Sequence, residues 1–388
     1  KWRQFQHLKV GLAHGPNKAQ VLADPQYDIV LLNYDGIVWA MEQLRAKHDF
    51  DVLLCDELSL LKNIQSQRFK ALKPMLETFK FRWGLTGTPA SNGLMDLFGQ
   101  VYTLDRGKRL GKYITHFRAK YFHQKPWDRY KYYISEAKAA ELSETVSDLL
   151  MSVKPEEWLD LPPFVVVTRD VYLDTQLHAK FWKWYKDLEF QMITHCQDQT
   201  ITATSAGVLT QKLRQLTSGA IYDENRNVIK FHDAKLDALS ELVDELLGEP
   251  LIVAYSTDHE RQRILERFPD AIALKGGMSQ AETEYAVSAW NSGQASMLLM
   301  QHQTSMGLNL QFGGNVICWF SLTYNLQDFI QLNKRLHRSG QTKPVFCYLL
   351  SIKGSIDEEV AQILADKNVT QEQLLERLKC KILQQADT

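Results

Sequence analysis

Short runs of apolar residues recur along the chain and are separated by segments of helix length. The runs are Ile29–Leu32, Val52–Leu54, Trp83–Leu85, Leu251–Tyr255, Met297–Met300, Val316–Phe320 and Val345–Leu350. Strands that are buried in a parallel sheet read as such continuous runs, bounded by polar or turn residues. The pattern therefore predicts two series of parallel strands, one in each half of the chain.

The stretch between the two series has a helical pattern. Behind Asp174, a candidate N-cap, apolar residues recur at spacings of three and four, which marks one face of a helix: Leu177, Phe181, Tyr185, Leu188 and Met192. A second helical stripe runs from Leu236 to Leu247, and Pro162 and Pro163 interrupt the chain before both stripes. We therefore expect the two strand series to belong to separate domains joined by helices.

Length and composition fit two domains of an ordinary globular protein. The chain has 388 residues, 45% of them apolar and 23% charged, and one hydrophobic core rarely serves a chain of this length. We predict an α/β fold. The first domain is expected over residues 1–165, with a basic helical insertion at about 105–160, and the second over residues 166–388, with a helical insertion at about 174–230.

Charge and cysteine content narrow the class of protein. The formal net charge is −1, so any polyanion must be held by a local patch. No apolar run approaches the ~18 residues that cross a bilayer, so no membrane association is expected. The five cysteines form no CxxC, which favours a reduced, intracellular protein, in the cytoplasm, at the nucleoid, in a phage-infected cell or in a eukaryotic nucleus.

Two adjacent carboxylates end one predicted strand. Asp56 and Glu57 follow the apolar run at Val52, which places both at the carboxyl edge of a parallel sheet, where α/β proteins bind ligands. One carboxylate can hold Mg²⁺ through water while its neighbour orients or deprotonates an attacking water. A solvated acid pair is the alternative. The next strand ends in Thr86-Gly87-Thr88-Pro89, whose hydroxyls can bond the carboxylates or a phosphate, and this favours the chemical interpretation.

A third group of residues suits phosphate binding. At ~100° per residue, Gln331, Arg335 and Arg338 are predicted to share one face of a helix, opposite apolar residues. Paired guanidiniums on a rigid helix suit phosphoryl charge, because their fork matches phosphate oxygens and their charge does not titrate away. The alternative is a basic face that is merely solvated.

Taken in order, these motifs resemble those of the superfamily-two helicase-like ATPases. They are Asp56-Glu57, Thr86-Gly-Thr-Pro89, Ser305-Met-Gly307-Leu-Asn309-Leu310 and Gln331-x3-Arg335-x2-Arg338-x-Gly340-Gln341. The last motif, the GLNL segment and Leu54-x-Asp56-Glu57-x4-Lys62-Asn63 are similar to the Swi/Snf-related branch, and the lean chain is similar to its phage and bacterial members. The resemblance covers essentially the whole chain. It implies two RecA-like, doubly wound lobes and a motor that uses ATP to move along double-stranded DNA.

The resemblance also implies roles for individual residues. ATP and Mg²⁺ are the implied cofactors: Asp56 serves Mg²⁺ through water, Glu57 activates water, and Arg335 and Arg338 reach from the second lobe to ATP bound against the first. Gly307 lines this cleft and Gln331 helps to close it. Coupling residues are Ser59, Thr86, Gly87 and Thr88. Residues that match the border of the nucleic-acid track are Asn33, Tyr34, Asn63, Lys275, Ser279, Thr304 and Ser305.

The chain departs from the family pattern in two places. Ser59 stands where many relatives have His, so the coupling between lobes is expected to differ. No GxxxxGK[ST] phosphate-binding loop occurs, and Gly11 to Ala19 imitates it with wrong spacing. In the family that loop precedes the segment that resembles Lys1 onward. We therefore expect that the first lobe lacks its opening strand-loop-helix here and that the chain as given turns over negligible ATP.

A local basic patch is present from Arg106 to Tyr133. This stretch holds nine basic residues, among them Lys120 and Lys125, against one acid, and eight aromatic residues interleave with them. Cations that neutralise phosphates, with aromatic rings nearby, suit a protrusion that contacts DNA. Equally, the rings can form a core that the basic residues coat.

The sequence thus predicts a monomeric DNA translocase with ATP between two lobes. One rival is a strand-separating helicase or restriction-type translocase of the same superfamily. Another is a catalytically silent scaffold that binds DNA or protein, which an absent phosphate loop would permit. The presence of Glu57, Arg335 and Arg338 together favours the motor, because a scaffold has no use for that trio.

Overall fold

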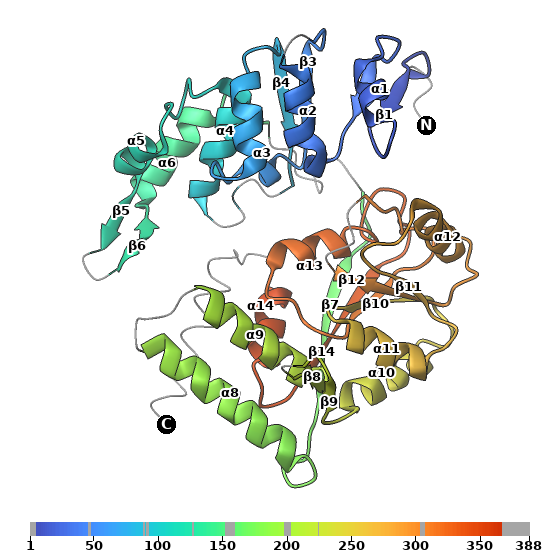
Figure 1. The fold of residues 1–388 in the computed structure, drawn as a ribbon. Coiled ribbons are helices and arrows are strands. Elements are labelled where there is room, and N and C mark those ends of the chain that lie inside the picture. The colour runs from blue at the N-terminus through green and yellow to red at the C-terminus, as the bar shows by residue number, and fades with distance from the viewer. Residues whose placement is uncertain are drawn as a thin grey trace. The chain divides into compact units, whose positions relative to one another are not determined.

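A computed structural model of the chain describes residues 5–45, 48–87, 90, 93–125, 128–151, 160–197, 203–223, 225–302 and 307–366. The chain forms two compact units, Lys1–Ser152 and Val153–Thr388, which are described one at a time (Figure 1). Both units combine helices with parallel strands, which confirms the α/β class. The division falls before residue 165, since β7 (Phe164–Val171) pairs within the sheet of the second unit.

The first unit alternates short strands with short helices. Its first elements are β1 (Val10–Leu12), α1 (Lys18–Ala23), β2 (Ile29–Leu31), α2 (Ile37–Leu44), β3 (Val52–Asp56), α3 (Gln67–Leu72) and β4 (Phe81–Leu85). The insertion follows as α4 (Leu97–Asp105), α5 (Ile114–Tyr121), β5 (His123–Lys125), β6 (Asp128–Tyr133) and α6 (Glu136–Val146). Single 3-10 turns include η2 (Tyr34–Gly36), η3 (Leu58–Leu61) and η5 (Leu94–Asp96).

The strands of the first unit are less buried than the sequence predicts. β1 pairs with β2 and β3 with β4, each in parallel. Helices α2 and α3 cover one face of these strands, with Met41, Cys55 and Phe69 in the core. Large apolar side chains on the other face are 40 to 57% exposed: Val10, Leu12, Ile29, Leu31, Val52, Leu54, Phe81, Trp83 and Leu85. The expectation of strands buried on both faces is therefore wrong here, because no described element covers that face.

The basic insertion has its own small core. Phe98, Phe117, Tyr121 and Leu142 are each at most 2% exposed and pack together between α4, α5 and α6. The insertion is not wholly helical, since β5 and β6 form an antiparallel hairpin. The aromatic residues Phe117 and Tyr121 of the basic stretch therefore belong to a core, as the second interpretation of that stretch expects.

The second unit is built on one larger sheet. After β7 come α8 (Ala179–Gln197), α9 (Ala203–Thr217), β8 (Ala220–Tyr222), β9 (Val228–Lys230), α10 (Ala234–Glu245), β10 (Leu251–Tyr255), α11 (Asp258–Arg267) and β11 (Ile272–Leu274). The chain continues with α12 (Gln280–Asn291), β12 (Met297–Gln301), β13 (Val316–Trp319), α13 (Leu326–Asn333), β14 (Val345–Ile352) and α14 (Asp357–Ala365).

Six parallel strands form this sheet in the order β11-β12-β10-β13-β14-β7. The chain moves from β10 to β11 in one direction and from β12 through β13 to β14 in the other. Because such crossovers are right-handed, α11 lies on one face and α12 and α13 lie on the opposite face. The sheet is therefore doubly wound, as predicted. All residues of β10 and β13 are buried, as continuous apolar runs require.

The helical insertion of the second unit begins later than predicted. Phe181, Tyr185 and Leu188 are buried on one face of α8, as the stripe requires. Leu177 is 84% exposed and precedes the helix, because Oδ1 of Asp174 accepts hydrogen bonds from the amides of Gln176 and Leu177 and forms a separate turn. No helix in the described ranges is long and apolar enough to cross a membrane.

Candidate functional site

The acid pair lies where β3 meets a left-handed turn. Asp56 is the exposed last residue of β3, and Glu57 follows with φ 57° and ψ 58°. A side chain in this left-handed region costs about 1–2 kcal/mol relative to ordinary helical torsions. Leu58 and Leu61, 3% and 0% exposed, anchor the η3 turn that follows. The packed turn thus holds a strained backbone that presents both carboxylates at the sheet edge.

Tyr34 supports this turn from another strand end. Its hydroxyl donates a hydrogen bond to the carbonyl of Asp56 at 2.7 Å and lies 3.3 Å from the carbonyl of Glu57. Burial, with the neighbouring Cys55, Asp56 and Glu57, raises the pKa of Tyr34 well above its usual range, so the phenol stays a neutral donor. Asn33 caps η2 by accepting the amide of Gly36 at 3.0 Å. The Asn33-Tyr34 segment is therefore bonded to the main chain of the acid pair.

The second predicted strand end lies beside the first. In the β3–β4 pair Asp56 stands opposite Leu85, and Thr86 and Gly87 follow directly. The carboxylates and the start of the TGTP motif therefore share one edge. Thr88 lies outside the described residues. Ser59, the predicted coupling residue, is 3% exposed within the first unit.

The two arginines do not share a helix with Gln331, contrary to the sequence prediction. Helix α13 ends at Asn333, and Arg335 and Arg338 lie in the turns that follow. The amide of Arg335 bonds the carbonyl of Leu332 at 3.0 Å, which tightens the last turn. Oδ1 of Asn333 accepts a hydrogen bond from the buried indole of Trp319 at 3.1 Å. This tertiary bond holds the last residue of α13 against β13, and no local pattern reveals it.

The arginine turns are bonded to the Gly307 segment within the second unit. The amide of Leu310 bonds the carbonyl of Arg335 at 3.3 Å, and Nη1 of Arg338 lies 3.4 Å from the carbonyl of Leu308. Gly307 has φ 77°, a conformation that side-chain-bearing residues rarely adopt. The structure thus brings together two motifs that are distant in sequence. Thr304 and Ser305, just before Gly307, lie outside the described residues.

Sequence reasoning missed a buried polar network at the carboxyl ends of β10, β12 and β13. Nδ1 of His302 lies 3.0 Å from Oδ2 of Asp328 on α13, and Nε2 lies 3.0 Å from Oγ of Ser256. Oγ of Ser321 lies 3.1 Å from Oγ of Ser256 and 2.9 Å from Oε2 of Glu260. The network ties α13 to three strands. Its sequence signal is a polar residue one or two positions after each apolar run.

Glu260 is held as an anion in this network although it is fully buried. Burial alone acts to raise its pKa, but His259, the amide of Ser256, Arg214 and the hydroxyl of Ser321 outweigh that effect and lower the pKa. A charged carboxylate with these donors is a rigid anchor. It fixes the start of α11 against the ends of β10 and β13.

Several predicted nucleic-acid residues serve local turns. Oγ of Ser279 donates to Glu282 at 2.7 Å in the capping box of α12, and Oδ1 of Asn63 accepts the amide of Gln65 at 2.9 Å. The amide of Lys275 lies 3.3 Å from the sulfur of Met278 in the loop before that helix. These contacts define the backbone around each residue and leave the exposed Lys275 amine at the surface.

Acidic residues outside the basic stretch compensate part of its charge. Nζ of Lys120 lies 3.4 Å from Glu141 and donates to the hydroxyl of Tyr121 at 2.8 Å, while Nζ of Lys125 lies 4.3 Å from the ring centre of Tyr133. Glu141 belongs to α6, beyond the basic stretch. The local positive charge is therefore smaller than the sequence count suggests.

The carboxylate oxygens of the acid pair suit one Mg²⁺ ion. Among the described residues no group of three or more His, Cys, Asp or Glu side chains is placed to hold a metal ion. Mg²⁺ in nucleotide sites usually keeps several waters and needs only one or two carboxylates besides phosphate. The exposed carboxylate of Asp56 meets that requirement.

Comparison with known proteins shows the family to which the chain belongs. The SNF2-related domain matches residues 1–221, and the helicase conserved C-terminal domain matches residues 234–340, which together define a helicase-like ATPase of superfamily two. Protein p41 of Acyrthosiphon pisum secondary endosymbiont phage 1 is 32% identical over 98% of this chain and 84% of its own length. The chain belongs to the SNF2-related family, as its motifs predict.

Other relatives are more distant and longer. An uncharacterized ATP-dependent helicase of Mycoplasma pneumoniae and the CHD3-type chromatin-remodeling factor PICKLE of Arabidopsis thaliana are each 24% identical over 93% of this chain, which spans 34% and 26% of their lengths. The SWI2/SNF2 ATPase core of Sulfolobus solfataricus, solved in complex with double-stranded DNA, is 21% identical, with 97% of this chain and 80% of that chain covered and a TM-score of 0.42.

Proposed function

We propose that this chain forms part of the ATP-hydrolysing motor of a double-stranded DNA translocase. The observation that carries the proposal is the bond from Tyr34 to the carbonyls of Asp56 and Glu57. It joins a segment expected to border DNA to the acid pair expected to act on ATP. Membership of a helicase-like ATPase family supports the use of a nucleotide.

Each nucleotide-site residue has a defined task in this proposal. Bound ATP and Mg²⁺ supply the phosphoanhydride bond and the charge that screens its oxygens. Asp56 would bind the cation through water, and Glu57 would accept a proton from the attacking water. Arg335 and Arg338 would donate hydrogen bonds to phosphate oxygens, and Gly307 and Gln331 would line and help to close the nucleotide site. The residues that would couple the state of this site to DNA are Ser59, Thr86, Gly87 and Thr88.

The phosphate-binding backbone is the part that the described residues do not supply. The chain contains no GxxxxGK[ST] sequence, and the strands of the first unit expose an apolar face that includes Leu54, Phe81 and Trp83. Large exposed apolar surfaces mark binding sites. We infer that a strand-loop-helix segment with the phosphate-binding glycines packs on this face. The chain alone should then show negligible ATP turnover, and robust hydrolysis by it would refute the inference.

DNA contact is proposed for both units. In the first unit the candidates are Asn33, Tyr34, Asn63, Lys120 and Lys125, and in the second they are Lys275, Ser279, Thr304 and Ser305. Lys275 is exposed in the loop before α12, where its ammonium group suits a phosphate. Lys120 and Lys125 are weaker candidates, because each already has a partner.

Replacing the proposed base tests the ATPase. In full-length protein, Glu57→Gln should leave ATP binding largely intact and stop turnover, because an amide cannot accept the proton from water. A fluorescent ATP analogue reports binding, phosphate release reports turnover, and Glu42→Gln, on the exposed face of α2, is the matched control. Unchanged turnover in the Glu57 variant would overturn the assignment.

Motion along DNA needs a separate assay. Translocation on duplex DNA should displace a third strand from a triplex in an ATP-dependent manner, without separating the two strands of the duplex. Displacement of a duplex strand instead would favour the strand-separating helicase. The absence of a phosphate-loop sequence favours one further candidate, a silent DNA-binding scaffold, which would bind duplex with no turnover even in the full-length protein.

A further inference from the structure

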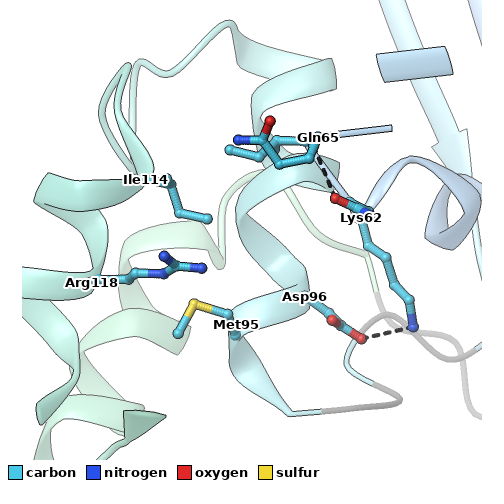
Figure 2. A pocket seen from close by; sticks show the side chains of 8 residues that line it. Lys62, Gln65, Met95, Asp96, Ile114 and Arg118 are labelled. Carbon is cyan, nitrogen blue, oxygen red and sulfur yellow. Dashed lines mark hydrogen bonds and ion pairs between the residues drawn. The ribbon is translucent and has the colours of Figure 1, made fainter. Parts of the chain in front are cut away.

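A cavity of about 330 Å³ opens in the first unit beside the segment that follows the acid pair (Figure 2). The loop after η3, the η5 turn and helix α5 contribute its walls, including Lys62, Gln65, Met95, Asp96, Ile114 and Arg118. Its volume is near the lower end of the ~300–1,000 Å³ of small-molecule sites. The cavity can therefore take a group of about one nucleotide in size.

Arg118 points into this cavity from α5, toward the wall that carries Lys62 (Figure 2). Its guanidinium carbon lies 4.7 Å from the ring centre of Tyr132 on β6, which fixes the direction of the side chain. Nε of Arg118 is buried and has no hydrogen-bond partner among the described residues. That nitrogen is out of reach of a ligand, but the charge of the guanidinium faces the cavity, so an anion there would be stabilised.

The opposite wall carries a second cation and one carboxylate. Nζ of Lys62 lies 3.0 Å from Oδ2 of Asp96, and the two side chains are 26% and 16% exposed. With Arg118 the lining holds two positive charges against one negative charge. The cavity thus has a net positive charge, and Asp96 reduces the attraction that Lys62 offers to an anion.

Other cations of the insertion form ion pairs with carboxylates. Arg106 lies 2.9 Å from Glu77, Nη2 of Arg109 lies 2.5 Å from Asp148, and Nζ of Lys120 lies 3.4 Å from Glu141. Arg118 instead packs on a ring and faces open space. The structure therefore separates one cation that is placed to bind a ligand from neighbours that are neutralised by carboxylates.

We propose that the Lys62–Arg118 cavity binds one nucleotide unit of a nucleic-acid strand. The phosphate lies between the two cations, because the guanidinium fork matches phosphate oxygens. The sugar lies against Ile114 and Met95, the apolar part of the lining. This inference rests on the proposed function and deepens it, because it places in one cavity a DNA contact that the sequence analysis assigned only to the stretch from Arg106 to Tyr133 and to Asn63.

The position of Lys62 gives this contact a consequence. Lys62 directly follows η3, whose Leu58 and Leu61 are almost fully buried, and η3 directly follows Glu57. A phosphate bound by Lys62 is therefore joined to the acid pair by one rigid turn. A shift of Lys62 when a DNA strand enters the cavity would therefore be transmitted through η3 to the backbone of Glu57. DNA binding would in this way change the position of the hydrolytic residues.

The test is the salt dependence of duplex binding by the full chain. Fluorescence anisotropy of a labelled duplex, measured from low to moderate salt, should give a slope of log affinity against log salt that Arg118→Gln reduces in magnitude by about 1. Affinity at low salt should fall about tenfold. Arg45→Gln removes an exposed arginine elsewhere in the same unit and should keep the wild-type slope.

Asp96→Asn gives a prediction of opposite sign. Without the carboxylate the cavity lining gains one unit of net positive charge, so binding should tighten and the slope should steepen. A residue with a purely structural role would not tighten binding when it is replaced. If wild type, Arg118→Gln and Arg45→Gln bind duplex with the same slope, the proposal that this cavity binds DNA is wrong, and the proposed function still stands.

Two further measurements separate the remaining outcomes. If Arg118→Gln unfolds the protein, labelling of arginines in the wild-type chain with phenylglyoxal replaces the mutant test. Bound duplex should protect Arg118 but not Arg45 from the reagent. Equal labelling of Arg118 with and without duplex overturns the proposal. If the wild-type chain binds no duplex, the proposed function fails. In that case thymidine 5′-monophosphate tests whether the ligand of the cavity is a free nucleotide. A rise in melting temperature that depends on Arg118 supports the site, and no rise overturns the site.

Discussion

The hydroxyl of Tyr34 donates a hydrogen bond to the carbonyl of Asp56 at a distance of 2.7 Å. The two residues belong to the ends of different strands, since Tyr34 follows β2 and Asp56 is the last residue of β3. The next residue, Glu57, has a left-handed backbone with φ 57°. The bond therefore supports a strained turn, and displacement of the Asn33-Tyr34 segment would be transmitted to the main chain of both acids.

Removing this hydroxyl should weaken coupling more than binding. For Tyr34→Phe in full-length protein we expect DNA-stimulated ATP turnover to fall about 2–10-fold, which corresponds to the loss of one hydrogen bond of about 0.5–1.5 kcal/mol. Affinity for duplex should stay near that of the wild type. Steady-state phosphate release with and without duplex measures the effect, and Tyr113→Phe, at a 62% exposed tyrosine, is the control. Equal stimulation in both variants would contradict the coupling role.

The contact between His302 and Asp328 should contribute to the stability of the second unit. Asp328→Ala leaves the 3%-exposed His302 without the acceptor 3.0 Å from its Nδ1, which should lower the free energy of unfolding by about 1–3 kcal/mol. Urea denaturation measures the change, with Asp244→Ala on the exposed face of α10 as control. A double-mutant cycle with His302→Ala isolates the pair. Additivity within about 0.5 kcal/mol would mean that the two side chains are not coupled.

Stability of the second unit should fall in mild acid because of His232. Burial, assisted by the charges of Arg263 and Lys235, lowers the pKa of His232 from 6.5 to about 3. The unfolded chain therefore binds a proton below pH 6.5 that the folded chain does not bind until pH 3. The associated stability is complete above pH 6.5 and is lost as the pH falls toward 3, by about 2 kcal/mol between pH 8 and pH 5.

Urea denaturation at pH 8 and pH 5 tests this sign. In that window the buried carboxylate of Glu260, whose pKa is lowered, stays ionised and adds no slope. Burial also lowers the pKa of His259, which adds a slope of the same sign. His232→Gln should therefore reduce the pH dependence of the unfolding free energy without abolishing it, whereas His116→Gln, at an exposed position in the first unit, should not change it. A His232 variant with the full wild-type slope would assign the acid sensitivity to other groups.

The sequence could predict strands where burial alone determines the residue pattern. β10 and β13 are buried throughout and read as continuous apolar runs. β7 was missed because polar residues occupy its second half. Arg169 in that half is bonded to Glu245 at 2.6 Å and to Glu241 at 3.0 Å on α10. An edge strand whose polar residues are neutralised by a distant helix has no local signal of this kind.

The candidate site shows the same division between local and tertiary information. The acid pair could be found because a strand end is a local feature, and its left-handed turn could not, since it depends on packing around Leu58. The helix predicted through Arg338 ends at Asn333, since the carbonyl of Arg335 accepts a hydrogen bond from the amide of Leu310, in a distant segment of the chain, and not from a residue one helical turn ahead. Counting charges from Arg106 to Tyr133 likewise could not include Glu141, which α6 brings to Lys120.

Replacement of Arg338 tests the role of the second unit in hydrolysis without a large change in its stability. Nη1 of Arg338 lies 3.4 Å from the carbonyl of Leu308, a long and therefore weak hydrogen bond. Arg338→Ala should accordingly lower the melting temperature only slightly. In full-length protein it should lower ATP turnover on the order of 10³-fold, by analogy with arginines that stabilise phosphoryl-transfer charge.

Arg338→Lys separates charge from geometry in the same assay. Lysine keeps the positive charge but has no planar fork, so we expect it to restore only a small part of the turnover lost in Arg338→Ala. Arg226→Ala, at an exposed arginine of the second unit, controls for loss of a cation. Single-turnover hydrolysis measures the chemical step directly. A rate for Arg338→Ala within about threefold of wild type would exclude this guanidinium from the reaction, because an interaction made in the transition state must change the rate when it is removed.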